Sequence, residues 1–215
     1  MCVILESSSD PTARIYQTSE RQSFHTDSTD VVGLLCLKKA QSGGESMLVS
    51  ALSIYNRFKE LRPDLLPLLF NPVATDRRGE VPEGELPFMT IPVFSWFEGH
   101  LTVFYQRQYI NSAKRFDDAP PLTDKHREAL DLFDTLANDP SLHFVMQLEP
   151  GDMQFLNNYV MLHTRSAYED HDDPAMKRLL WRLWLMNADL RPRTGYTRNF
   201  QHGVQLSTLR NQIRL

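Results

Sequence analysis

Short segments of alternating polarity fill the last third of the chain, and this period of two is the feature that most constrains the fold. The segment LHFVMQLEPGDMQFLNNYVMLHTR (142–165) holds two such runs around a Pro-Gly-Asp turn, and KRLLWRLWLMN (177–187) holds another. Alternation predicts strands, and a turn between two of them predicts a hairpin. VVGLLCLKKA (31–40), before a Gly-Gly turn, and LTVFYQRQYI (101–110) are further predicted strands.

Two segments instead predict amphipathic helices. In residues 50–61 the apolar side chains Leu52, Tyr55, Phe58 and Leu61 recur every three residues, and a proline ends the pattern. Residues 122–139 begin with a threonine cap and also carry apolar residues at intervals of three. Many short strands with only two helices predict a mixed α+β, mainly β fold, such as a β-sandwich or jelly roll with helices packed outside.

Length and composition restrict the class of protein further. A chain of 215 residues predicts a single domain over 1–215, and a net charge of −4 argues against a nucleic-acid partner. Cys2 and Cys36 are too few for a disulfide framework, and Cys36 lies in an apolar run typical of a buried thiol. No secretion signal or membrane span is evident, so the expected location is cytoplasmic.

A histidine followed two residues later by an acid occurs three times. His126 begins one such pair on a predicted helix, where residues two apart face different directions. His171 begins another in a hydrophilic run that predicts a solvated loop. In FHTDST, however, His25 and Asp27 lead into a strand, and an extended backbone turns both toward the same side. This pair predicts either two metal ligands or two hydrogen-bonded polar residues at a strand end.

A third ligand is needed for a metal site, and His163 is the candidate. It lies in the apolar strand YVMLHTR, where a buried histidine needs partners for its nitrogens. A hydrogen-bonded core histidine is the alternative. Two imidazoles and one carboxylate that leave coordination positions open suit non-heme Fe(II), whereas zinc favours a closed tetrahedral site.

The strand 177–187 adds possible anion ligands. Arg178 and Arg182 share one face by the period of two, together with Trp184. Arginines on so apolar a strand predict a bound dicarboxylate, with Ser46 as an additional hydroxyl donor, or else an exposed face of an edge strand.

The order of these segments resembles the TauD/TfdA family of Fe(II)- and 2-oxoglutarate-dependent dioxygenases. FHTDST is similar to its HxD motif, SGGES to its Gly-Gly-acid-Ser/Thr turn, and the segments around residues 163 and 178 to its distal-histidine and arginine strands. Together these motifs span residues 24–185. The resemblance implies a double-stranded β-helix core, that is, a cupin-like jelly roll, with flanking helices.

The resemblance also implies roles for particular residues. His25, Asp27 and His163 would be the metal and catalytic residues that bind Fe(II), while Arg178 and Ser46 would hold the distal carboxylate of 2-oxoglutarate. Arg182 would lie nearer the metal-bound end or the primary substrate. The implied reaction consumes O2 and oxidises, usually by hydroxylation, a small organic substrate, with release of succinate and CO2. A substrate that carries a carboxylate or sulfonate is one candidate.

Three further expectations complete this interpretation. Asn157 resembles a family asparagine and is expected to orient a turn, while Phe94, Trp96 and Tyr105 predict core packing or pocket walls. The region before the HxD motif is shorter than in the family, so strands can be missing and an exposed edge would favour a homo-oligomer. A non-catalytic remnant and a zinc hydrolase are the alternatives, and residues 190–215 predict an arginine-rich tail or lid.

Overall fold

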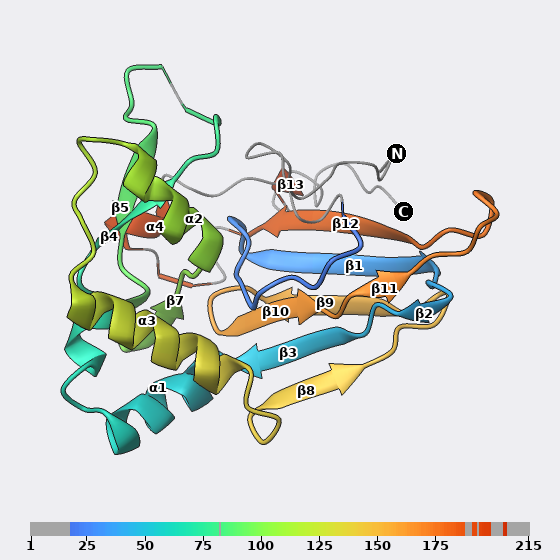
Figure 1. Ribbon diagram of the computed structural model, residues 1–215, viewed down its shortest axis with the longest axis horizontal. Coiled ribbons are helices and arrows are strands. Elements are labelled where there is room, and N and C mark those ends of the chain that lie inside the picture. Colours follow the sequence, from blue (N-terminus) through green and yellow to red (C-terminus); the bar gives the residue numbers. More distant parts are fainter. Residues whose placement is uncertain (1–17, 82, 188–190, 193, 199–203, 206–215) are drawn as a thin grey trace.

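The computed structural model describes residues 18–81, 83–187, 191–192, 194–198 and 204–205. Cys2 and most of the predicted tail or lid over 190–215 lie outside these residues. The fold is mixed α+β and mainly β, as predicted, and consists of several small antiparallel sheets and one end at which helices gather (Figure 1). Within the described residues no helix is both long and apolar enough to cross a membrane.

The strands are short, and most belong to one of two sheets. They are β1 (Val31–Lys38), β2 (Ser42–Gly43), β3 (Ser46–Ser50), β4 (Val73–Asp76), β5 (Phe88–Ile91), β6 (Phe94–Phe97), β7 (His100–Val103), β8 (His143–Met146), β9 (Met153–Asn157), β10 (Met161–Arg165), β11 (Tyr168–Glu169), β12 (Leu179–Met186) and β13 (Val204–Gln205). One sheet has the order β13-β12-β1-β9 and the other β10-β3-β8. The pairs β11-β2, β4-β5 and β6-β7 stand separately.

The predicted hairpin over 142–165 is wrong. The strands β8, β9 and β10 do form there, but β8 and β10 pair with β3, whereas β9 pairs with β1 in the other sheet. Successive strands therefore cross from one sheet to the other. Alternation indicates a strand but does not specify its partner, which tertiary contacts decide.

The helices are α1 (Ala51–Leu61), η2 (Leu66–Phe70), α2 (Arg107–Ser112), η3 (Ala113–Arg115), α3 (Asp124–Ala137) and α4 (Gly195–Arg198). Both predicted helices are confirmed: the hydroxyl of Ser50 accepts a hydrogen bond from the backbone N–H of Ser53 at the start of α1, and Thr123 does the same for His126 in α3. The predicted strand over 101–110 is only half right. It ends at Val103 as β7, and α2 begins at Arg107.

The buried face of α1 differs from the prediction. Leu52 and Leu61 are exposed, and the residues that enter the core are Ala51, Ile54 and Phe58. The core lies between α1, α3 and the strands β3, β6, β7 and β10; Phe58, Phe94, Tyr105, Phe133 and Leu162 are among its fully buried members. Phe94 and Tyr105 are thus core residues, whereas Trp96 is 57% exposed.

The two faces of the β13-β12-β1-β9 sheet differ. Trp181 and Leu183 of β12 and Met153 and Phe155 of β9 project outward and are exposed. The opposite face carries Arg182 and Trp184 toward the segment that contains His25 and Asp27. The predicted arginine face of this strand therefore points toward Asp27 at Arg182, although Arg182 itself remains exposed.

Candidate metal centre

The two candidate histidines lie directly opposite each other on neighbouring segments. The backbone N–H of His25 donates to the carbonyl of His163 at 3.0 Å, and the N–H of His163 donates to the carbonyl of His25 at 3.0 Å. Such a mutual pair places the two side chains on one face, and the ring centroids are 4.4 Å apart. The long-range pairing of one strand therefore brings the predicted third ligand to the HxD motif.

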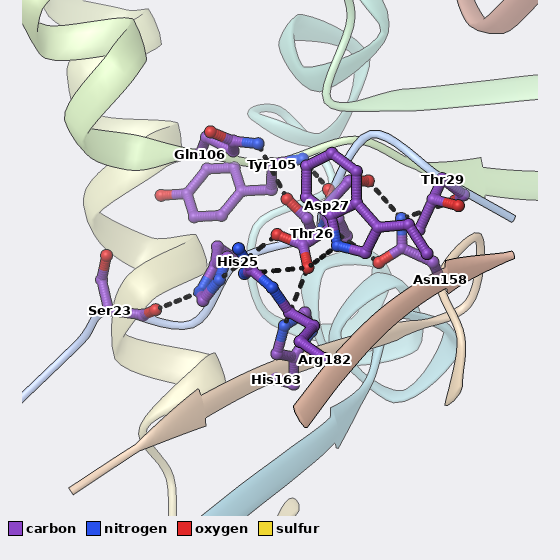
Figure 2. Close-up of polar contacts among 11 residues, drawn as sticks. Ser23, His25, Thr26, Asp27, Thr29, Tyr105, Gln106, Asn158, His163 and Arg182 are labelled. Atoms are coloured by element: carbon purple, nitrogen blue, oxygen red, sulfur yellow. Dashed lines mark hydrogen bonds and ion pairs between the residues drawn. The ribbon is translucent and has the colours of Figure 1, made fainter. Parts of the chain in front are cut away.

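Asp27 completes the cluster (Figure 2). His25 Nε2 lies 3.8 Å from Asp27 Oδ1, and His163 Nε2 lies 3.7 Å from Asp27 Oδ2. One ligand atom from each of the three residues lies within 4.8 Å of the other two. By contrast, His126 lies on α3 and His171 lies in a loop, as predicted for both, and the His126 ring bonds to Thr123.

The donor set has the chemistry that a divalent metal requires. His25 Nδ1 donates to the backbone carbonyl of Ser23 at 2.9 Å, and this contact directs Nε2 toward Asp27. Burial lowers the pKa of His163 to about 3, so its imidazole is neutral at pH 7. Two imidazoles that turn Nε2 toward a carboxylate therefore fit a metal ion with open coordination positions.

Asp27 is held as a carboxylate. Its burial tends to raise its pKa, but the nearby His163, His25 and Arg182 side chains and a hydrogen bond from Trp184 lower that pKa below its usual value. Trp184 Nε1 donates to Asp27 Oδ2 at 2.9 Å, and Arg182 Nη1 lies 3.4 Å from the same oxygen. Two donors thus orient one carboxylate oxygen.

The backbone around Asp27 is clamped from two sides. Asn158 Oδ1 accepts from the N–H of Asp27 at 3.0 Å, while its Nδ2 donates to the carbonyls of Asp27 and Thr29. On the other side, the N–H of Thr26 donates to the carbonyl of Tyr105, and Gln106 Nε2 donates to the carbonyl of Thr26 (Figure 2). These contacts hold the HxD segment extended.

The sequence did not identify all of these residues. Asn157 was predicted to orient a turn, and its side-chain oxygen indeed accepts a hydrogen bond from the N–H of Tyr159 in the turn that follows. Its neighbour Asn158, which clamps Asp27, was not predicted, although a polar residue at a strand end was a usable signal. Trp184 was placed on the correct face by the period of two, but its contact with Asp27 was not foreseen.

The predicted anion ligands lie farther from the cluster. Arg178 stacks on the ring of Tyr168 with 5.1 Å from Cζ to the centroid, and no carboxylate of the described residues forms an ion pair with its guanidinium. Burial, as the largest effect, lowers the pKa of Arg178, which nevertheless remains a cation. Ser46 is buried, and its Oγ donates to Gln154 Oε1 at 2.8 Å.

Glycine is required at the turn beside Arg178. Gly43 and Gly44 have φ angles of 72° and 76°, in the left-handed region that favours glycine. A Cβ atom on Gly44 would lie 3.1 Å from Arg178 Nε, and one on Gly43 would lie 2.2 Å from the carbonyl oxygen of Ala167. The Gly-Gly turn therefore makes room for the arginine.

Comparisons with known proteins identify relatives of this chain. The model of the family described as "Taurine catabolism dioxygenase TauD, TfdA family" matches residues 3–184. The FR-33289 synthase of Streptomyces rubellomurinus is 39% identical over 179 residues, which cover 81% of this chain and 52% of that protein. The chain thus spans about half the length of this curated relative.

Solved structures share the fold. Asparagine oxygenase in complex with Fe(II), 2S,3S-3-hydroxyasparagine and succinate aligns with a TM-score of 0.65 and 18% identity, over 91% of this chain and 60% of that one. The non-heme iron oxygenase OrfP with Fe and alpha-ketoglutaric acid aligns with a TM-score of 0.60 and 15% identity, over 94% and 61%. With the family match over residues 3–184, these findings show that the chain belongs to the TauD/TfdA family of dioxygenases.

Proposed function

We propose that this chain forms the catalytic core of an Fe(II)- and 2-oxoglutarate-dependent dioxygenase that oxidises a small organic substrate. The observation that carries the proposal is the His25, Asp27 and His163 cluster, whose ligand atoms lie within 4.8 Å of one another where His25 and His163 form a β-bridge. Family membership and the iron-containing complexes of the structural relatives support it.

In this proposal each residue of the cluster has a defined task. His25 and His163 present imidazole Nε2 atoms, and Asp27 supplies the negative charge that partly neutralises a divalent cation. Bound iron would supply the redox chemistry that couples O2 and 2-oxoglutarate consumption to oxidation of a C–H bond, with release of succinate and CO2. Trp184 and Asn158 keep the carboxylate and its backbone in place.

The two arginines are proposed to bind different groups. The partly buried guanidinium of Arg178 is available to a carboxylate, and bidentate binding by arginine suits the distal carboxylate of 2-oxoglutarate. Arg182 lies beside Asp27 and so serves the end near the metal or the primary substrate. Ser46 would act on co-substrate binding indirectly, because its hydroxyl donates to Gln154.

The strand order supports a double-stranded β-helix as the form of this core. The sequence of strands β8, β9, β10 and β12 alternates between the β10-β3-β8 sheet and the β13-β12-β1-β9 sheet. Such alternation winds one chain through two facing sheets, as in a jelly roll. The motifs from residue 24 to residue 185 then belong to a single domain, with the metal cluster between the sheets and the helical end.

The proposed substrate is a small molecule. The asparagine oxygenase and OrfP structures contain hydroxylated amino acids as ligands, so amino acids and related anionic compounds are the first candidates to assay. Arg182, at the proposed metal end, favours a substrate that carries a negative charge.

Anaerobic addition of Fe(II) and 2-oxoglutarate to the purified chain tests the proposal. A weak visible charge-transfer absorption should appear, and His163→Ala should abolish it. His126→Ala is the matched control, because that histidine lies on α3 away from the cluster and should leave the absorption unchanged.

The alternatives predict other outcomes. Absorption without succinate release across a broad substrate panel would indicate a non-catalytic remnant that retains the site. A protein that binds zinc but gives no absorption with Fe(II) and 2-oxoglutarate would favour a hydrolase and refute the proposal.

A further inference from the structure

Gln154 is a buried polar residue whose amide group is only half satisfied. It lies on β9 with 7% of its surface exposed, and its Oε1 accepts a hydrogen bond from Ser46 Oγ at 2.8 Å. Its Nε2 is buried and has no hydrogen-bond partner among the described residues. The side-chain amide nitrogen has two N–H groups, and a buried N–H group without an acceptor lowers stability. A ligand that supplies an acceptor at this position would therefore be favoured.

The position of Gln154 suggests where that acceptor comes from. Leu34 of β1 pairs across the sheet with both Gln154 and Arg182, so all three side chains project from the inner face. Two strand spacings separate Gln154 from Arg182, which is roughly 10 Å. An acceptor at Nε2 would therefore lie farther from Asp27 than the metal-bound end of a ligand does.

Arg178 approaches the same region from the neighbouring turn. Its Nε packs against Gly44, two residues before Ser46, the hydrogen-bond partner of Gln154. Burial raises the pKa of the Cys36 thiol on β1. The guanidinium of Arg178 lies close enough to that thiol to oppose this rise. Cys36 is diagonal to Gln154 on the inner face. A cation and a neutral donor are thus directed to one region.

The hydroxyl of Ser46 cannot supply this donor while it is bonded to Gln154. A serine hydroxyl has one proton, and Ser46 gives it to Gln154 Oε1. The unused N–H groups of Gln154 are therefore the neutral donors available to an anion held by Arg178.

We propose that Gln154 Nε2 donates a hydrogen bond to the distal carboxylate of 2-oxoglutarate and thereby selects this dicarboxylate over 2-oxo acids that lack the second carboxylate. The inference rests on the proposed function. It assigns Gln154 a specificity role in addition to the cation Arg178, because an amide donor that is left unpaired with the wrong ligand penalises that ligand.

Calorimetric titration of the Mn(II)-loaded 215-residue chain tests this role, since Mn(II) replaces iron without oxidation chemistry. The ligands are 2-oxoglutarate and 2-oxovalerate, which has the same carbon chain without the distal carboxylate. In Gln154→Met, 2-oxoglutarate should bind about tenfold or more weakly, the expected effect of losing a hydrogen bond to a charged group. Binding of 2-oxovalerate should not weaken and should become somewhat tighter, because Gln154→Met removes the donor that this ligand leaves unpaired. Gln41→Met, at an exposed glutamine, should change neither ligand.

A second variant separates the donor from the packing. Gln154→Glu keeps an acceptor for Ser46 but replaces the donor with a negative charge, so it should weaken 2-oxoglutarate binding more than Gln154→Met does. Unchanged 2-oxoglutarate affinity in both variants, or equal losses for both ligands, would overturn the inference. A wild-type chain that binds no 2-oxoglutarate in the presence of Mn(II) would instead refute the proposed function.

Discussion

Replacement of Trp184 by phenylalanine should weaken metal binding, although Trp184 is not itself a ligand. The indole N–H donates to Asp27 Oδ2 at 2.9 Å, and Asp27 is 6% exposed, so water cannot readily replace the lost bond. Phenylalanine keeps an aromatic ring in place and removes only the donor. The carboxylate would then be oriented by Arg182 alone, whose Nη1 lies 3.4 Å from the same oxygen.

The size of the effect follows from that geometry. A hydrogen bond to a charged group contributes about 1.5–3 kcal/mol, and the remaining contact with Arg182 places the expected loss near the lower end, at about 1.5–2 kcal/mol. This corresponds to a roughly 10- to 30-fold increase in the metal Kd, within the range for residues that orient metal ligands. Titration of Mn(II) into the metal-free chain, followed by calorimetry, measures it.

Trp181→Phe provides the matched control. Trp181 lies on the same strand, but it is 60% exposed on the outer face of the sheet, away from the cluster, so its replacement should leave the metal Kd unchanged. A Trp184→Phe chain that binds Mn(II) within about twofold of wild type, or an equal loss in both variants, would show that the indole hydrogen bond does not orient the ligand.

Three other changes test the fold and its electrostatics. In metal-free protein His163 has a pKa of about 3 against 6.5 for an ordinary histidine, so the unfolded chain binds the extra proton and the free energy of unfolding should fall as pH drops from 6.5 toward 3, by up to about 1.4 kcal/mol per pH unit. Urea unfolding should show a shallower decline in His163→Gln. Gly43→Ala should cost about 2 kcal/mol or more, because its Cβ would lie 2.2 Å from a carbonyl oxygen, whereas Gly84→Ala, with nothing within 4 Å, should cost only the positive-φ strain of about 1 kcal/mol. Ser50→Ala should lower stability by about 1 kcal/mol through loss of the α1 cap, and an unchanged thermal midpoint would contradict that role.

Local signals were sufficient where the determining contacts are local. Apolar spacing predicted α1, and apolar spacing together with the Thr123 cap predicted α3, because capping and helical periodicity act within a few residues. The short helix α2 was missed, since Tyr105 and Ile110 belong to a stretch that also alternates like a strand and its first residue has no side-chain cap. The buried face of α1 shifted to Ile54 because the neighbouring elements, not the helix, decide which stripe is covered.

The metal cluster shows the same division. The extended HxD segment by itself determined that His25 and Asp27 point the same way, since side chains two apart in a strand share a face. Only the tertiary structure could bring His163 opposite His25, turn Arg182 and Trp184 toward Asp27, and place Gln154 against Ser46. Those contacts depend on which strands pair across the chain, and alternation specifies the face of a strand but not its partner.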